Sequence, residues 1–268
     1  MSVILWNTLK AHRWPLLAMV GLVLGLGVLI VASYDSFGPE SNPEFYEQLP
    51  KAMAALMKVE GNLLLASGPE GFIATGFRHP LFLIIVAAFG IGSASAAMAR
   101  EIERRTVLFI LARPLSRYRL VLGKGLGSML GVVALVSSLL VGSFIGIAIQ
   151  GLDGIRVDVL LLMGINALCL GLAIAGYAYL ISALSSDGSR ANLLATGVTV
   201  ALFFLDFVSD LFEVLEPVGL LSVFNYFDPV NVAIDGGFPG VHVGVLLAIA
   251  AATFISALVI FQRRDIAA

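Results

Sequence analysis

The chain has 268 residues, of which 59% are hydrophobic and only 13% charged, and its formal net charge at pH 7 is -2. Soluble domains contain about 45–50% apolar and about 25% charged residues, so this composition excludes a soluble globular protein and predicts an all-α integral membrane protein. The small net charge gives no support for nucleic-acid binding, and the single cysteine excludes an intramolecular disulfide.

The N-terminal residues 1–13 combine apolar side chains with Trp6, Lys10 and Arg13. This composition predicts a short interfacial helix that leads into the first span. The apolar run that follows has no small-residue cleavage site before a soluble domain. We therefore expect a retained span rather than a removed signal peptide.

Six segments are long and apolar enough to cross a bilayer, which takes about 20 residues. Small residues recur along them, for example Gly123, Gly127 and Gly131, and such residues allow close helix packing either within one subunit or between subunits. We predict six transmembrane helices in a single transmembrane domain that covers residues 1–268. The approximate bounds of the spans are 15–33, 80–99, 123–149, 157–184, 191–214 and 241–261.

The segment between the first two spans, residues 34–79, is long for a membrane connector. Within it, apolar residues recur at helical spacing over 45–59, which predicts one amphipathic helix at the outer membrane surface. We interpret the segment as an extracytoplasmic loop that attracts cationic groups and binds an extracytoplasmic partner. Its acidic residues are Asp35, Glu40, Glu44, Glu47, Glu60 and Glu70.

The segment between the second and third spans is the densest basic region of the chain. It also carries an apolar stripe over residues 107–111 that has no reason to face water, so it predicts a docking element rather than a passive connector. Of the 16 Lys and Arg residues in the chain, those in this segment are Arg100, Arg104, Arg105, Arg113, Arg117, Arg119 and Lys124.

The distribution of cations predicts the orientation, because cytoplasmic loops carry an excess of Lys and Arg. With the N-terminus inside, the cations outside are Lys51, Lys58, Arg78 and Arg156. The remaining twelve are inside, and an even number of spans then places both termini in the cytoplasm. These inside cations are Lys10, Arg13, the seven of the basic segment, Arg190, Arg263 and Arg264.

Intramembrane charge is sparse, and Asp206 and Asp210 near the outer end of the fifth span are the main example. Their spacing of four places them on one helix face. A charge near the middle of a membrane costs about 2.5–3.5 kcal/mol on insertion scales, so it usually faces protein or water. Two interpretations remain: a polar lining at an outer exit, or an interfacial position for Asp210 with Asp206 buried against a donor.

The segment before the last span, residues 215–240, mixes apolar and aromatic residues with several Gly and Pro. It is too short and too broken to cross a membrane. Non-helical backbone at membrane depth is tolerated only where protein or water satisfies it. We therefore expect a re-entrant or surface-lying outer element.

Several catalytic signatures are missing from the sequence. Gly123 and Lys124 lack the upstream glycine and the following hydroxyl residue of a phosphate-binding loop. There is no His-Glu-x-x-His zinc site and no Gly-x-Ser-x-Gly elbow. An intramembrane protease is a weak alternative, because Glu101 and Glu103 have no histidine partner in the spans. We predict no catalytic residue and no metal site.

The basic segment and the six spans together resemble the permease subunits of type-2 ABC transporters, the exporter-like class. Arg104 and Arg105 stand where the family usually has an acid and a glycine. The specific motif covers only residues 100–124 and says nothing about the substrate. The matching residues are Glu101 and Glu103 at acidic positions, Thr106, the apolar stretch 108–111, Pro114, Ser116 and Arg117, and the closing pair Gly123 and Lys124.

The resemblance implies a transmembrane subunit of an ATP-driven exporter in the cell inner (plasma) membrane. It implies a separate ABC ATPase subunit that docks on residues 100–122 and holds ATP and Mg, so that this chain binds no cofactor and is not itself an enzyme. It also implies a second permease copy or a paralogue, which forms the pathway as a dimer in the lipid bilayer. The alternative is a non-transporting scaffold or mechanotransmission subunit driven by an ATPase.

The physical chemistry of residues 100–122 agrees with an ATPase-coupling role. Pro114 disfavours helix before it and has no N–H to donate, so it ends a cytoplasmic coupling helix between spans 2 and 3. Ser116 then suits the N-cap of the next helix. The predicted ATPase-coupling residues are Glu101, Glu103, Thr106, Leu108, Leu111, Arg113, Pro114, Ser116 and Arg117.

Overall fold

The computed structural model describes residues 2–44, 48, 50–58, 68–103 and 116–264. This part of the chain is helical, with no strand among the described residues. Six of its helices are long and apolar enough to cross a membrane, as predicted. These are α1 (Ser2–Ala32), α7 (Pro80–Ala97), α10 (Arg117–Gln150), α11 (Val157–Leu184), α12 (Gly188–Leu211) and α15 (Gly240–Arg263).

Shorter helices cover the two ends of the bundle. One of them, α8 (Ala99–Glu103), continues from α7. Two groups lie in the connections before α7 and before α15. They are α2 (Tyr34–Phe37), α4 (Lys51–Met57) and α6 (Gly68–Arg78), and then η1 (Glu213–Leu215), α13 (Glu216–Gly219), η2 (Val223–Tyr226) and α14 (Pro229–Asp235).

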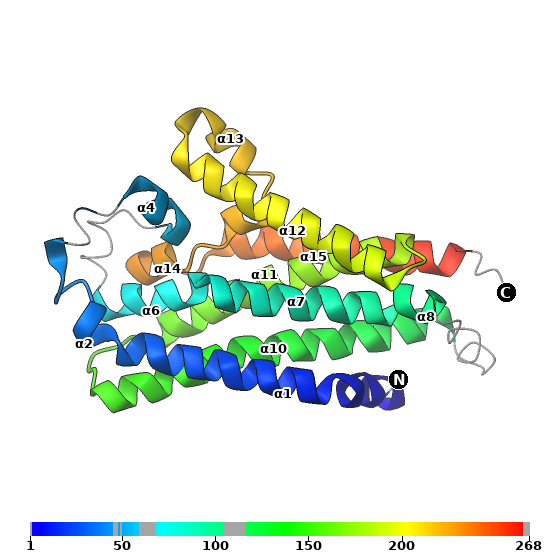
Figure 1. The fold of residues 1–268 in the computed structure, drawn as a ribbon, viewed down its shortest axis with the longest axis horizontal. Helices are drawn as coiled ribbons and strands as arrows, with labels where there is room; N and C mark the ends of the chain where they lie inside the picture. Colours follow the sequence, from blue (N-terminus) through cyan, green and yellow to red (C-terminus); the bar gives the residue numbers. More distant parts are fainter. Residues whose placement is uncertain (1, 45–47, 49, 59–67, 104–115, 265–268) are drawn as a thin grey trace.

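Both chain termini and α8 lie at one end of the bundle, which we call the coupling end (Figure 1). The helices α2, α4 and α14 lie at the opposite end, which we call the distal end (Figure 1). The predicted division of the cations follows this geometry, because Lys58 and Arg78 belong to the distal end while Arg117 and Arg264 belong to the coupling end. The six spans therefore bring the start of α1 and the end of α15 to the same end of the bundle, as an even number of spans requires.

Helix α11 lies at the centre of the bundle. In its apolar window 72% of the residues are buried, against 22% in the windows of α1, α12 and α15. Its neighbours include α7, α10 and α15, whose side chains form one continuous core with it. The peripheral helices leave apolar surface uncovered, which in a membrane faces lipid or another subunit.

Small residues bring α1 and α10 into close contact. A Cβ on Gly142 would lie 2.2 Å from the Leu24 carbonyl oxygen, and a Cβ on Gly27 would lie 2.7 Å from the Leu139 carbonyl oxygen. Only glycine permits this approach at these positions. Of the two interpretations of the small-residue pattern, packing within one subunit therefore holds here, whereas Gly21 faces open space.

Helix α10 begins at Arg117, six residues before the predicted start of its span at 123. Ser116 is its N-cap, as predicted, and its side chain accepts a hydrogen bond from the Arg119 N–H at 3.3 Å. The 34 residues of α10 give a length of about 51 Å. This exceeds a hydrocarbon layer of about 30 Å, so the helix projects beyond the membrane.

The predicted N-terminal helix is joined to the first span without a break. α1 runs from Ser2 to Ala32 as one helix with Pro15 inside it. A lone proline does not end a helix where the turns on both sides continue to bond, although it removes one donor. The position of this N-terminal part at a membrane surface stays a prediction.

The segment 34–79 is more structured than a loop. Helix α4 lies within the predicted amphipathic region, in which residues 45–47, 49 and 59 are outside the described part. Helix α6 was not predicted, and three glycines and a proline in 68–78 argue against a helix. Its Phe72, Ile73 and Phe77 are buried in the bundle, and this packing overrides the weak local propensity.

The segment before α15 is broken into short helices, as its breakers predict. Phe224, Phe227 and Val230 are almost completely buried, so the segment packs onto the bundle. Asp228 caps α14 by accepting a hydrogen bond from the Asn231 N–H. Re-entry of this segment into the membrane stays a prediction.

Candidate functional site

The predicted coupling residues lie at the coupling end of the bundle, on both sides of a gap in the described chain. Glu101 and Glu103 belong to α8, while Ser116 and Arg117 begin α10. The other predicted coupling residues, Thr106, Leu108, Leu111, Arg113 and Pro114, lie outside the described residues.

Glu101 joins α8 to α10 through a lysine. The Lys124 ammonium pairs with the Glu101 carboxylate and also donates to the Ala97 carbonyl oxygen at 3.1 Å. The Lys124 side chain is only 12% exposed. A lysine so far from water needs such acceptors, because burial disfavours its charged form. The contact therefore fixes the start of the coupling segment against α10.

Glu103 joins α8 to the first residue of α12. Its Oε2 accepts a hydrogen bond from the Gly188 N–H at 2.9 Å. The first N–H groups of a helix have no partner within the helix. A carboxylate at this position accepts a hydrogen bond from one of them and interacts favourably with the positive end of the helix dipole. From α7, the Ser95 hydroxyl donates to the Gly188 carbonyl oxygen at 2.8 Å. Both backbone polar groups of Gly188 are thus bonded to the neighbouring segment.

Gly188 also lies unusually close to α8. A Cβ at this position would lie 3.1 Å from the Arg100 Cβ and 3.1 Å from Oε2 of Glu103. A larger residue would push α8 and α12 apart. Glycine therefore fits this close contact without displacing its neighbours, and the contact places α12 directly against the coupling segment.

Two further contacts complete the network at the coupling end. The Ser182 hydroxyl of α11 donates to the Ala94 carbonyl oxygen at 2.8 Å and accepts from the Ala99 N–H at 3.1 Å. The Arg117 Nη1 donates to the Arg264 carbonyl oxygen at 2.6 Å. The junction of α7 and α8, and the start of α10, are thereby tied to α11 and to the end of α15.

Arg264 in turn binds the end of α11. Its Nη1 donates to the carbonyl oxygens of Ala183 and Ser185, at 2.8 and 2.7 Å. The last carbonyl groups of a helix lack partners within the helix, so an arginine is a suitable donor there. Five of the six long helices therefore meet in one hydrogen-bonded network: α7, α10, α11, α12 and α15.

The ATPase-coupling role expected for the two acids of the motif stays a prediction. In the structure the Glu103 carboxylate bonds within the chain to Gly188. Gly188, Ser95 and Ser182 were not predicted as site residues. The signal for Gly188 was its position after Asp187, which is an N-cap residue; no sequence signal shows that α8 lies against it.

A second polar cluster lies at the distal end, around Asp206. This side chain is 1% exposed, and its Oδ1 lies 2.7 Å from the Lys58 Nζ. Its Oδ2 lies 3.7 Å from Nη2 of Arg78. Lys58 also lies 3.8 Å from the Asp210 carboxylate, so both acids face the same side, as their spacing predicts. Sequence reasoning identified the two acids but not their two cationic partners.

Lys58 reaches this cluster from a strained backbone position. It is the C-cap of α4 and has a φ of 49°, in the left-handed region. This region costs about 1–2 kcal/mol for a residue with a side chain, and glycine usually occupies it. From this position its side chain reaches Asp206, so the ion pair links α4 to α12.

Arg78 is held by the segment before α15. Its Nη1 donates to the Phe227 carbonyl oxygen at 3.1 Å, and its guanidinium lies 5.9 Å from the centre of the Phe227 ring. Burial lowers the pKa of Arg78, and the negative charge of Asp206 opposes this effect. The cluster thus joins α4, α6, α12 and the segment before α15.

Of the two interpretations of Asp206, burial against a donor agrees with the observed ion pairs. Asp210 is 27% exposed at its side chain, which agrees with a position near the membrane surface. A role of either residue in an outer pathway stays a prediction.

A neighbouring ion pair strengthens the distal end. Glu70 of α6 accepts hydrogen bonds from the Arg156 backbone N–H at 2.7 Å and from its Nε at 2.9 Å. The Arg156 Nη2 also donates to the Ala233 carbonyl oxygen of α14 at 2.8 Å. The hydrogen bonds to Glu70 raise the pKa of Arg156. One arginine therefore joins α6, the α10–α11 connection and α14.

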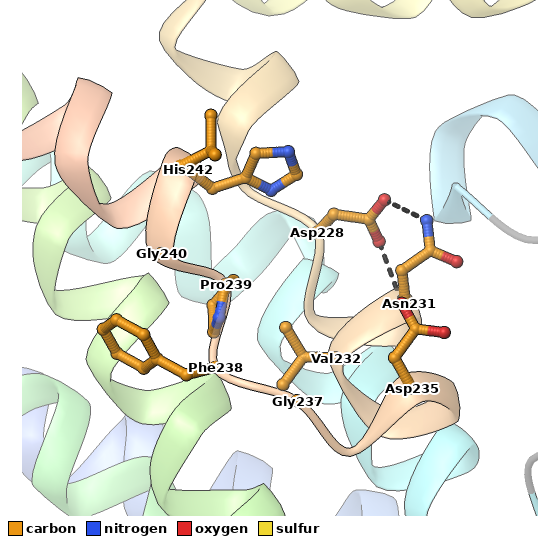
Figure 2. Close-up of a pocket in the computed structure, with 10 residues that line it drawn as sticks. Asp228, Asn231, Val232, Asp235, Gly237, Phe238, Pro239, Gly240 and His242 are labelled. Carbon is orange, nitrogen blue, oxygen red and sulfur yellow. Dashed lines mark hydrogen bonds between the residues drawn. The ribbon is translucent and has the colours of Figure 1, made fainter.

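A cavity of about 290 Å³ opens beside α14 (Figure 2). Among its lining residues are Asp228, Asp235 and His242, but both carboxylate oxygens of Asp228 are already bonded to Asn231 (Figure 2). The described residues contain no group of three His, Cys, Asp or Glu side chains able to hold a metal ion.

The comparisons with known proteins agree with this architecture. The family described as ABC-2 family transporter protein matches residues 7–266, which is nearly the whole chain. No curated protein matches the sequence. The six membrane-spanning helices, the motif of residues 100–124 and the extent of the family match together show that the chain belongs to the ABC-2 family of transporter proteins and is a permease-type membrane subunit.

Proposed function

We propose that this chain is the transmembrane subunit of an ATP-driven exporter and that a separate ATPase docks on residues 100–122. One observation carries the proposal: both described sides of this segment are bonded into the bundle. Glu103 binds the start of α12, and Arg117 binds the end of α15. A displacement of the residues between them would therefore reach several spans through short polar contacts.

The charge distribution supports a cytoplasmic position for the coupling end. Arg117, Arg190 and Arg264 lie there with both termini, and basic residues favour the cytoplasmic side. In this orientation α4 and α6 face the other side of the plasma membrane. The segment 34–79 then offers its exposed Asp35, Glu40 and Glu44 to an extracytoplasmic partner, whereas Glu70 is buried against Arg156.

The energy source and the second half of the pathway belong to other chains. We propose that ATP and Mg bind to the partner ATPase, because this sequence lacks the glycine and hydroxyl residues of a phosphate-binding loop. We propose a second permease copy against the peripheral helices, since 78% of each apolar window of α1, α12 and α15 is not buried. Asp210, which is partly exposed, would line the outer part of the pathway, and Asp206 would reach it only after leaving its buried contacts with Lys58 and Arg78.

The test is ATPase binding by variants of the apolar stripe. Burial of a Leu-sized side chain contributes roughly 1.5–3 kcal/mol, so Leu108→Asp or Leu111→Asp should weaken binding roughly 10- to 150-fold. Arg119→Ala removes an exposed charge worth about 0–1 kcal/mol and serves as the control. Binding is measured by co-purification and titration of the ATPase chain against correctly inserted protein. Equal binding by all variants would exclude docking through this segment.

Transport and mechanotransmission are separated in reconstituted vesicles. An exporter should show ATP-dependent movement of its substrate, and this movement should disappear in the Leu108→Asp variant. ATP hydrolysis by the complex without flux of any tested substrate, together with an ATP-dependent change in an outer partner's binding, would instead support the scaffold function.

A further inference from the structure

Helix α12 is attached to the bundle differently from the other two peripheral spans. α1 is locked to α10 by glycine contacts, and α15 approaches α11 so closely that a Cβ on Gly176 would lie 2.9 Å from the Ala250 carbonyl oxygen. In α12, by contrast, Gly197 has no atom within 4 Å of its Cβ position. The outer half of α12 also diverges from the bundle, with α13 at its tip (Figure 1).

Polar contacts therefore hold α12 at three levels. At the coupling end, Gly188 binds Glu103 and Ser95. In the middle, the hydroxyls of Thr199 and Tyr177 of α11 lie 2.6 Å apart. Further out, the Ser222 hydroxyl binds the Leu202 carbonyl oxygen, and Asp206 binds Lys58.

The spacing of these contacts suits a lever. Thr199 lies eleven residues after the first residue of α12 and seven before Asp206. At 1.5 Å per residue these separations are about 16 Å and about 10 Å. A sideways displacement at Gly188 would therefore turn α12 about its contact with Tyr177 and move Asp206 in the opposite direction.

The ion pair at the far end of this lever is built so that it can separate. Lys58 comes from the segment 34–79, 148 residues away from Asp206 in sequence. Asp210 lies one turn further along α12, 3.8 Å from Lys58, so it moves together with Asp206 and belongs to the same contact. Its side chain is 27% exposed, so water reaches this side of the contact and lowers the cost of separating the charges.

We propose that the Lys58–Asp206 ion pair is a latch that holds the outer half of α12 against the segment 34–79, and that displacement of the coupling segment releases it through Glu103 and Gly188. The coupling half of this inference rests on the proposed function. The latch itself does not, because it is a property of the isolated chain. Lys58 is thus a positioning residue for the outer half of α12.

The latch is tested first in the isolated chain in lipid nanodiscs. Cys169 is buried and is replaced by alanine, and spin labels are attached at Val214→Cys beyond α12 and Val157→Cys at the start of α11, both exposed positions. Lys58→Met should broaden the distance distribution between the labels and shift it to longer distances. Lys51→Met, which removes an exposed lysine from the same helix, should leave the distribution unchanged.

A second label pair reports whether the variants remain folded. Val157→Cys and Val241→Cys mark α11 and α15, which are closely packed, so their distance should not change in Lys58→Met. If the Val157–Val241 distance does change in Lys58→Met, the test uses Lys58→Arg instead, with Lys51→Met again as the control. Lys58→Arg keeps the charge and should retain the parental Val214–Val157 distribution. Equal Val214–Val157 distributions in Lys58→Met and Lys51→Met would overturn the latch, as would a loss of the parental distribution in Lys58→Arg.

The coupling half is tested in the complex with the ATPase. ATP should shift the Val214–Val157 distance in the parent, and Glu103→Gln should reduce this shift while ATPase binding persists. An ATP-independent distance in a stable complex would overturn the coupling to α12. Failure of the ATPase to bind at all would contradict the proposed function instead, and the result in the isolated chain would still decide the latch.

Discussion

At the start of α12 the neighbouring segment supplies hydrogen bonds to backbone groups, whereas near its other end the neighbours supply charged side chains. Gly188 is bonded through its own N–H and carbonyl, and a Cβ there would lie only 3.1 Å from Arg100 and Glu103. Asp206 is bonded through a carboxylate that two cations share. Backbone contacts at close approach fix the position of a helix, while long side chains can exchange partners. The start of α12 is therefore held more rigidly than the region around Asp206, as the proposed coupling requires.

The largest expected effect is at the distal end. Asp206→Ala removes the carboxylate that faces Lys58 and Arg78, and loss of one member of a buried ion pair costs about 3–5 kcal/mol. The free energy of unfolding should fall by about that amount in detergent or nanodiscs. Asp153→Ala, at an exposed residue of the α10–α11 connection, is the control and should have little effect. Equal stability of both variants would show that the cluster contributes nothing to the fold.

A methyl group added at Gly188 tests the close contact between α8 and α12 at the coupling end. Gly188→Ala would force α8 away from α12, and overpacking of this kind costs about 1–3 kcal/mol. Gly197→Ala on the same helix meets open space, so it should stabilise the helix by up to about 1 kcal/mol. Chemical unfolding measures both effects. A neutral Gly188→Ala would contradict the close contact between α8 and α12.

Loss of the Ser116 cap should have a moderate effect. Ser116→Ala removes the acceptor for the Arg119 N–H, and loss of an N-cap costs about 0.5–2 kcal/mol. Because this cap precedes the long helix α10, the variant should also increase proteolysis near residue 116. Ser116→Asp supplies another N-cap acceptor and should behave like the parent. If Ser116→Asp and Ser116→Ala behave alike, the cap does not order this end of α10.

The smallest effect concerns pH at the distal end. His79 Nδ1 accepts a hydrogen bond from the Leu81 N–H at the start of α7, and burial lowers its pKa. A lowered pKa in the folded state means that the unfolded chain binds the proton more readily, so stability is lost as pH falls from about 6.5 towards the folded value. The loss should be below about 1 kcal/mol, since the residue is largely exposed. His79→Asn keeps a capping side chain and should remove this part of the pH dependence of unfolding. An unchanged pH dependence would rule out His79 as its source.

The sequence by itself determined the class of fold and the bounds of the central span. Apolar runs near 20 residues allow only spanning helices in a bilayer, because each backbone polar group must be bonded within its own segment. The bounds of α11 agree with the predicted 157–184, and Ser116 is the predicted cap of α10. Local chemistry decides such features, so a single sequence is enough to predict them.

Only the tertiary structure decided which polar groups meet. No local pattern predicts that Lys58 pairs with Asp206, or that Glu103 binds Gly188 rather than facing outward. Helix α6 was missed for the same reason, since burial of Phe72 and Phe77 stabilises a glycine-rich segment whose own propensity is poor. In each case the partner lies far away in sequence. Burial of the apolar rings stabilises α6, whereas the ion pair and the hydrogen bond offset the cost of removing charged groups from water.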